Sequence, residues 1–234
     1  MTLLYVIIGV NALLSIRGFS DYTLFEQLKF RVGDILHQKD WKRIVTSGFL
    51  HVDYTHLFFN MYALYMFGPD LFSVFSPIEF VLIYMGSLIA GNLLALFIHS
   101  NHYNYTAVGA SGAVSGIIYS HIILFPHGHI GLIFIPGLSI PSWIFGLLYI
   151  LYTIFGIKSQ RDNIGHEAHL GGAIAGLLLT VLYLRGYPFD YKIIGLLVAP
   201  TLIFLYLIAY HPEWLLTGKI NWSNSPLSKI GQRF

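Results

Sequence analysis

The sequence predicts an all-α fold, a polytopic helical bundle that spans a membrane. Hydrophobic residues make up 56% of the 234-residue chain and charged residues only 10%, which is too apolar for an ordinary water-soluble domain. Several apolar runs approach the roughly 20 residues that a helix needs to cross a hydrocarbon core of about 30 Å. We therefore expect an integral, multi-pass membrane domain over residues 1–210, with the lipid bilayer as its surroundings.

Apolar runs and the residues that interrupt them predict seven helices. We place them at residues 2–16, 49–67, 79–98, 108–125, 141–157, 168–184 and 192–210. The first run lacks a basic leader and a small-residue cleavage site, so we interpret it as a retained helix and not as a signal peptide. The first helix is short and the second is polar over its first half, so we expect these two to give the weakest hydropathy signals.

The segments between and within these helices have distinct compositions. Residues 17–48 alternate charged and aromatic side chains, which predicts an interfacial subdomain. Residues 126–141 are rich in Pro and Gly, as is typical of a tight loop at the membrane edge, and residues 211–234 form a polar tail. Glycines gather in the fourth and sixth helices, where small residues let two helix backbones approach closely. We expect those two helices to pack against each other.

Composition also argues against several classes of function. A net charge of +2 without a concentrated basic face gives no basis for nucleic-acid binding. The chain contains no cysteine, which excludes disulfides, thiol catalysis and cysteine-ligated metals. His166 and His169 are three residues apart and therefore do not form an H-E-x-x-H zinc motif, and a catalytic zinc would need a third ligand. We expect no metal and no cofactor, and the sequence leaves the oligomeric state undefined.

Four polar side chains inside the predicted helices are candidates for chemistry, because polar groups are costly in lipid. They are His56, Asn60, Ser111 and His169. His56 and Asn60 are four residues apart and share one face of a helix. If neighbouring helices alternate in direction, the second, fourth and sixth helices all run the same way across the membrane. Because the candidates lie in the N-terminal parts of those helices, the sequence predicts that they meet at one depth.

A hydroxyl and an imidazole at one depth can serve as the nucleophile and general base of acyl transfer. The Ser111 N–H, with side-chain donors from His56 and Asn60, could then stabilise an oxyanion. Plainer interpretations stay open: Ser111 as helix-packing material, His169 as a structural histidine, and His56 with Asn60 as an interhelical pair. Glu167 lies two residues from His169 and faces a different direction, so we do not assign it an orienting role. The remaining histidines that we considered are interpreted as interfacial or internally paired: His51, His121, His166 and His211.

Three ordered motifs resemble those of the rhomboid intramembrane proteases. Gly109-Ala110-Ser111-Gly112 is similar to the family's G-x-S-G motif, the segment from Ala168 to Gly176 to its A-H-x-x-G-x-x-x-G motif, and the segment from His56 to Asn60 to its H-x-x-x-N motif. Trp41-Lys42-Arg43 is similar to the W-x-R element. The resemblance covers about residues 41–185, so the helix near residues 192–210 would be a seventh helix added to a six-helix core.

The resemblance implies a serine-type endopeptidase that cleaves the transmembrane segments of other membrane proteins. Ser111 would be the nucleophile and His169 the general base, while His56, Asn60 and the Ser111 N–H would form the oxyanion hole. The residues expected to support this site are Gly109, Gly112, Gly172, Gly176 and Arg43. One departure is Ser115, which stands where rhomboids often have an aromatic residue that stacks on the catalytic histidine.

Membrane orientation gives two conflicting expectations. The family's active site usually opens on the extracytoplasmic side, here of the cell membrane, and that orientation places 11 of the 13 Lys and Arg residues outside. The positive-inside rule predicts the reverse. We follow the family, because the basic first loop is expected to be a folded interfacial element.

Two other functions stay open at this point. One is a catalytically inactive rhomboid-like protein that binds or escorts membrane proteins. The other is a small transporter that uses intramembrane His and Asn side chains as a relay. Retention of both Ser111 and His169 favours the protease.

Overall fold

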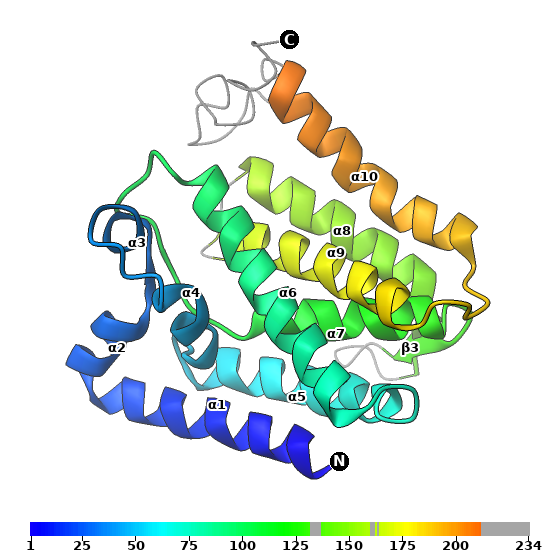
Figure 1. The fold of residues 1–234 in the computed structure, drawn as a ribbon, viewed down its shortest axis with the longest axis horizontal. Coiled ribbons are helices and arrows are strands. Elements are labelled where there is room, and N and C mark those ends of the chain that lie inside the picture. Colours follow the sequence, from blue (N-terminus) through cyan, green and yellow to red (C-terminus); the bar gives the residue numbers. More distant parts are fainter. Residues whose placement is uncertain (132–136, 160–161, 163, 212–234) are drawn as a thin grey trace. The chain divides into compact units, whose positions relative to one another are not determined.

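Seven long helices form the framework of the part of the protein that the structure describes (Figure 1). The structure is a computed structural model that describes residues 1–131, 137–159, 162 and 164–211. The long helices are α1 (Thr2–Ser20), α5 (Tyr54–Leu71), α6 (Pro77–Ile98), α7 (Ser111–Leu124), α8 (Ser142–Ser159), α9 (His166–Tyr183) and α10 (Tyr191–Tyr210). They match the seven predicted helices and confirm the all-α class. Apart from His211, the predicted polar tail lies outside the described residues.

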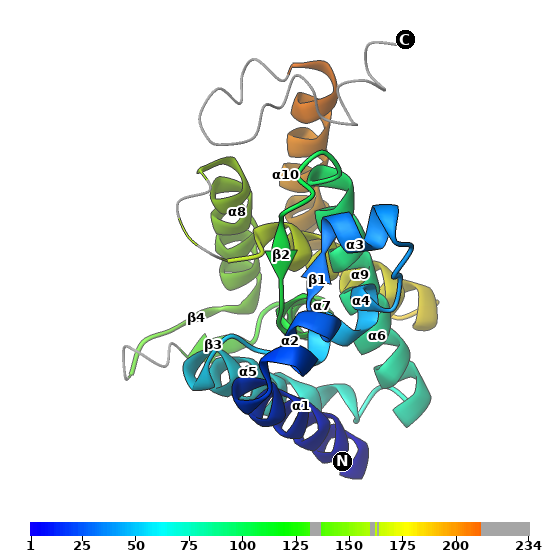
Figure 2. The same ribbon diagram turned by 90° about the vertical axis from the view of Figure 1, so that its left-hand side faces the viewer.

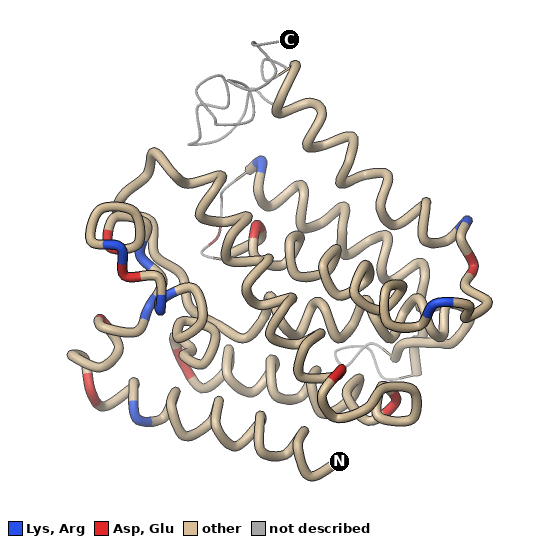
Figure 3. Tube along the Cα trace, viewed as in Figure 1, with Lys and Arg blue, Asp and Glu red and all other residues tan. Residues whose placement is uncertain are grey.

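Within these ranges, four helices are long and apolar enough to cross a membrane, namely α1, α6, α8 and α10. Helix α7 is apolar but shorter. The expectation of a weak signal from the first helix was wrong, because α1 continues to Ser20 instead of ending near residue 16 and is apolar over that length. Most of the length of α6 and α10 carries no charged residue (Figure 3). The protein is therefore an integral, multi-pass membrane protein.

Capping residues set the start of two helices near the candidate site. The Asp53 side chain accepts a hydrogen bond from the His56 N–H at 2.7 Å, so α5 begins at Tyr54 and not at residue 49 as predicted. The preceding residues form the short 3₁₀ helix η1 (Ser47–Phe49), which leaves His51 in the connection between the two. Helix α6 begins with a capping box between Ser76 and Glu79.

The connection after α1 is a folded subdomain of short elements, as the sequence predicted. It contains α2 (Tyr22–Leu28), β1 (Phe30–Arg31), α3 (Val32–His37) and α4 (Arg43–Thr46). Strand β1 pairs antiparallel with β2 (Thr106–Ala107), which lies just before α7, and Figure 2 shows the two strands side by side. This pairing ties the subdomain to the segment that leads into the candidate site.

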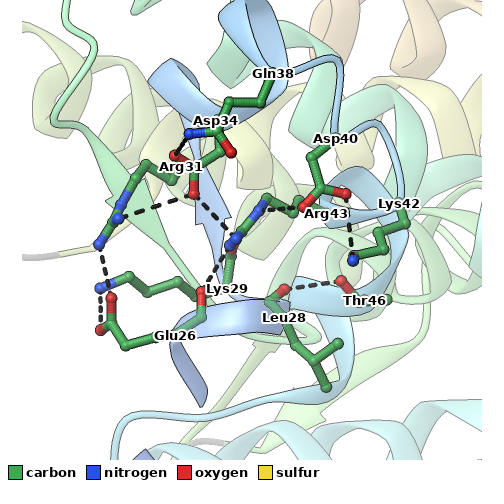
Figure 4. Close-up of polar contacts among 10 residues, drawn as sticks. All are labelled: Glu26, Leu28, Lys29, Arg31, Asp34, Gln38, Asp40, Lys42, Arg43 and Thr46. Carbon is green, nitrogen blue, oxygen red and sulfur yellow. Dashed lines mark hydrogen bonds and ion pairs between the residues drawn. The ribbon is translucent and has the colours of Figure 1, made fainter. Parts of the chain in front are cut away.

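The buried Arg43 holds the subdomain together (Figure 4). Its guanidinium donates at 2.7 Å to the backbone carbonyl oxygens of both Glu26 and Lys29. It also lies 3.0 Å from an Asp34 carboxylate oxygen and 2.9 Å from one of Asp40. All three nitrogen atoms of the planar guanidinium thus contact a partner, and a lysine side chain could not reproduce this arrangement. Arg43 therefore supports the fold around the site from outside the site itself.

The chain divides into two compact units. The first consists of Met1–Ser120 and Glu167–Arg185, and in it α1 packs against α5 and α4 against α6. The second consists of His121–His166 and the described residues from Gly186 onward; in it α8 packs against α10, and β3 (His129–Gly131) pairs with β4 (Ser139–Pro141). All the candidate site residues belong to the first unit.

Candidate active site

Backbone contact between α7 and α9 forms the base of the candidate site. A Cβ atom added to Gly172 would overlap the backbone of Gly112, and one added to Gly176 would overlap that of Gly116. Ser120 bridges the same two helices, because its hydroxyl reaches the carbonyl oxygens of Gly116 at 2.9 Å and Gly176 at 3.2 Å. The prediction that the glycine-bearing helices pack closely is confirmed.

This contact brings the neighbours of the two proposed catalytic residues together. A Cβ on Gly112, which follows Ser111, would lie 3.1 Å from the carbonyl oxygen of Ala168, which precedes His169. The Ala168 carbonyl also lies against Gly91 of α6. Ser111 and His169 are both half-buried. The first turns of α7 and α9 thus meet at the positions of the predicted nucleophile and base.

Gly109 forms a corner into which two of the predicted side chains point. Its φ of +136° is a backbone conformation that residues with a Cβ rarely adopt. An added Cβ would lie 3.0 Å from Nε2 of His56 and 3.5 Å from Oγ of Ser111. The imidazole and the hydroxyl therefore border the same small volume, which the glycine keeps open.

The segment before Ser111 is held by hydrogen bonds from distant parts of the chain. The Gly109 N–H donates to the Ser47 carbonyl oxygen at 3.0 Å, and the Ala110 N–H donates to Nε2 of His51 at 3.4 Å. His51 is fully buried, and its Nδ1 lies 2.8 Å from the Ser15 hydroxyl. Because Nε2 accepts, Nδ1 carries the proton and the ring is neutral. His51 is internally paired, as interpreted, and it also helps to place Ser111.

Asn60 and Ser115 each bond to a backbone carbonyl oxygen one turn earlier in their own helix. The buried Asn60 donates from Nδ2 to the carbonyl oxygen of His56 at 3.0 Å, and this bond uses only one of the two amide hydrogens. The hydroxyl of Ser115 donates to the Ser111 carbonyl oxygen at 2.7 Å, within its own helix. Among the described residues, no group of three or more His, Asp or Glu side chains is arranged to hold a metal ion.

Sequence reasoning missed one buried polar cluster beside α9. His99 and Glu167 are in direct contact, with 2.9 Å between Nε2 and Oε1. Two signals could have found it: a histidine at the end of a strongly apolar helix, and a carboxylate in the first turn of another. Such groups are rarely buried unless they are paired.

Comparison with known proteins places the fold in a family. The Rhomboid domain family matches residues 38–186, which closely follows the predicted 41–185. The chain is 31% identical over 183 residues to the mitochondrial Rhomboid protein 1 of Saccharomyces cerevisiae, covering 75% of this chain and 51% of that protein. It is 34% identical over 145 residues to the putative rhomboid protease YdcA of Bacillus subtilis, covering 61% and 67%. The rhomboid protease AarA of Providencia stuartii is 30% identical over 164 residues, covering 62% and 57%.

The helical membrane fold with a glycine-bearing α7–α9 contact is thus that of an intramembrane rhomboid domain. The chain belongs to the rhomboid family. It spans about half the length of the yeast relative and two thirds of YdcA.

Proposed function

We propose that this protein is an intramembrane serine endopeptidase that cleaves transmembrane segments of other membrane proteins. The observation that carries the proposal is the shared corner at Gly109, where the Ser111 hydroxyl and the His56 imidazole border one volume. The packing of Ala168 on Gly112 supports His169 as the third member. Several relatives are named as proteases.

In the proposed reaction, Oγ of Ser111 attacks the scissile carbonyl carbon while His169, as a neutral imidazole, takes the hydroxyl proton. The carbonyl electron pair moves to oxygen, and the Ser111 N–H, His56 and the second amide hydrogen of Asn60 stabilise that charge. His169 then returns the proton to the leaving amine nitrogen, and an acyl-enzyme remains. A water molecule, deprotonated by His169, hydrolyses this ester and frees Ser111.

The proposed membrane domain comprises residues 1–210, with α10 as an addition to a six-helix core. The site is proposed to open on the extracytoplasmic face of a cell membrane. Several of the relatives are named as mitochondrial proteins. Transmembrane proteins are the proposed substrates, and no cofactor takes part in the reaction.

The second candidate function is that of an inactive protein that binds or escorts membrane proteins. It is favoured by Ser115, which occupies the position where family members often have an aromatic residue. Activity of the purified chain separates these two functions.

The test is cleavage of a transmembrane peptide after reconstitution of both partners in liposomes. We expect wild type and the control Ser159→Ala to cut the peptide, because in the contacts described the Ser159 hydroxyl bonds only to the Gly156 carbonyl oxygen of its own helix. Ser111→Ala and His169→Ala should each lose cleavage. Cleavage that survives in Ser111→Ala would contradict the protease mechanism, and an inert wild type beside an active rhomboid would favour the escort function.

A further inference from the structure

A buried ionisable cluster lies at the start of α9 and takes no part in the proposed reaction. The side chains of His99 and Glu167 are each only 5% exposed, and their Nε2 and Oε1 atoms are 2.9 Å apart. The Tyr105 hydroxyl donates to the other carboxylate oxygen of Glu167 at 3.4 Å. The Tyr105 ring stacks on the His99 ring, with centroids 3.6 Å apart and planes 10° apart. Removing one partner of such a buried pair is strongly destabilising.

The cluster reaches water through a third ring. His102 is exposed, and its Nδ1 lies 3.4 Å from Nδ1 of His99. Partial burial, with the nearby His99, lowers the pKa of His102 from its ordinary value. Burial and the charge of Glu167 raise the pKa of Tyr105 well above its ordinary value, so Tyr105 stays a hydrogen-bond donor. Among the described residues, His99 and Tyr105 are the ionisable groups in contact with this carboxylate, and His102 follows behind His99.

The position of the cluster connects it to the proposed base. Helix α9 begins at His166, so Glu167, Ala168 and His169 all belong to its first turn. Glu167 is bound to His99, the C-cap residue of α6, and Ala168 packs on Gly91 of the same helix. A carboxylate in the first turn is also favoured by the helix dipole. The two residues before His169 are therefore both anchored to α6.

We propose that His99 and Glu167 form a positioning pair that fixes the first turn of α9 and thereby orients His169 toward Ser111. This inference rests on the proposed function. Glu167 acts through the backbone of its helix, since residues two apart on a helix face different directions.

The pair further links the site to the folded first loop. The Tyr105 carbonyl oxygen accepts a hydrogen bond from the Val32 N–H at 3.1 Å, and the Tyr105 ring contacts that of Phe30 edge-on at 6.2 Å. Both partners are fully buried in the core of the subdomain. Anchoring of α9 thus extends from α6 into the subdomain through a single stacked tyrosine.

The test compares the reconstituted wild type with Glu167→Ala, Glu167→Gln, His99→Ala and the double variant His99→Ala with Glu167→Ala. We expect Glu167→Ala to lower kcat about tenfold or more with KM changed by less than about twofold, because a small displacement of a catalytic group mainly slows the chemical step. Glu167→Gln should recover most of this loss at neutral pH, since a neutral imidazole N–H can donate to the amide oxygen. The double variant should resemble the worse single variant, as expected of two residues that act as a unit.

The split between kcat and KM separates positioning from a general loss of stability. Thr180→Val is the matched control: Thr180 is a fully buried polar residue of α9 that bonds only one turn back along its own helix in the contacts described. It should leave both kcat and KM unchanged.

The outcomes are distinguishable from those for the proposed function. An inert wild type contradicts the protease itself. An active wild type with Glu167→Ala within about twofold in kcat overturns the positioning role. If Glu167→Ala does not fold, His99→Ala decides, and a kcat within about twofold of wild type overturns the inference.

Discussion

Replacing Gly172 with alanine should separate α7 from α9 at the level of the candidate site. The new Cβ would lie 2.7 Å from the carbonyl carbon of Gly112 and 3.0 Å from its Cα. Because carbon atoms in contact are ordinarily about 3.5–4.0 Å apart, and because the overlapping atoms are backbone, the two helices must move apart by about 1 Å. Gly112 follows the proposed nucleophile, so this displacement would be transmitted to Ser111 and His169.

The expected effect can be estimated from general magnitudes. Misplacing reacting groups by about 1 Å can slow catalysis roughly 10²-fold, and overpacking a well-packed contact typically destabilises by about 1–3 kcal/mol. We therefore expect Gly172→Ala to lower kcat/KM for a transmembrane peptide about 100-fold and to lower the melting temperature in detergent.

The matched control is Gly9→Ala in α1, where an added Cβ meets no atom within 4 Å. Alanine is favoured over glycine inside a helix by about 0.5–1 kcal/mol, so this variant should be as active as wild type and no less stable. If Gly172→Ala and Gly9→Ala gave equal activity and melting temperatures, the close α7–α9 contact would not set the geometry of the site.

Three further predictions concern the surroundings of the site. Gly109→Ala should reduce activity about tenfold or more, since its Cβ would lie 2.8 Å from Cε1 of His56 at a positive φ; Gly186→Ala shares a positive φ but meets no neighbour, so it should leave peptide cleavage unchanged. Arg43→Met should destabilise the fold by about 3–5 kcal/mol in chemical denaturation, because it removes the buried guanidinium from the Asp34 carboxylate and from two backbone carbonyl oxygens, whereas the exposed Arg17→Met should change little. A hydrogen bond from Lys29, with the charges of Lys29 and Arg31, lowers the pKa of Glu26; its carboxylate thus adds stability above an unfolded pKa of about 4.3 that is lost as pH falls through the lower folded value. The melting-temperature difference between wild type and Glu26→Gln should accordingly shrink in acid, and a difference that persisted there would contradict this assignment.

Long-range features of the fold were predictable from the sequence, because lipid imposes strong constraints on composition. Apolar runs of the length of α6 and α10 have one stable conformation in a bilayer, so their presence and approximate ends followed from hydropathy. The close packing of α7 on α9 followed from their glycines, since a Cβ at Gly172 or Gly176 would fill the space of the facing backbone.

Local boundaries were less predictable, because they depend on single side chains. The start of α5 shifted to Tyr54 because Asp53 caps it, although apolarity suggested an earlier start. Spacing within one helix correctly paired His56 with Asn60 on one face. The pairing of His99 with Glu167 joins residues 68 positions apart. Each residue is unusual in its own helix, but the sequence does not indicate that the two are partners.

The most direct test of the central claim is to map where a fluorophosphonate probe attaches to the detergent-solubilised protein, using mass spectrometry of its peptides. The probe forms a covalent bond only with a serine whose hydroxyl is activated by a base. The account predicts one adduct, on Ser111, in wild type, and its loss in His169→Ala. An adduct on another serine, or an undiminished Ser111 adduct in His169→Ala, would contradict the proposed dyad.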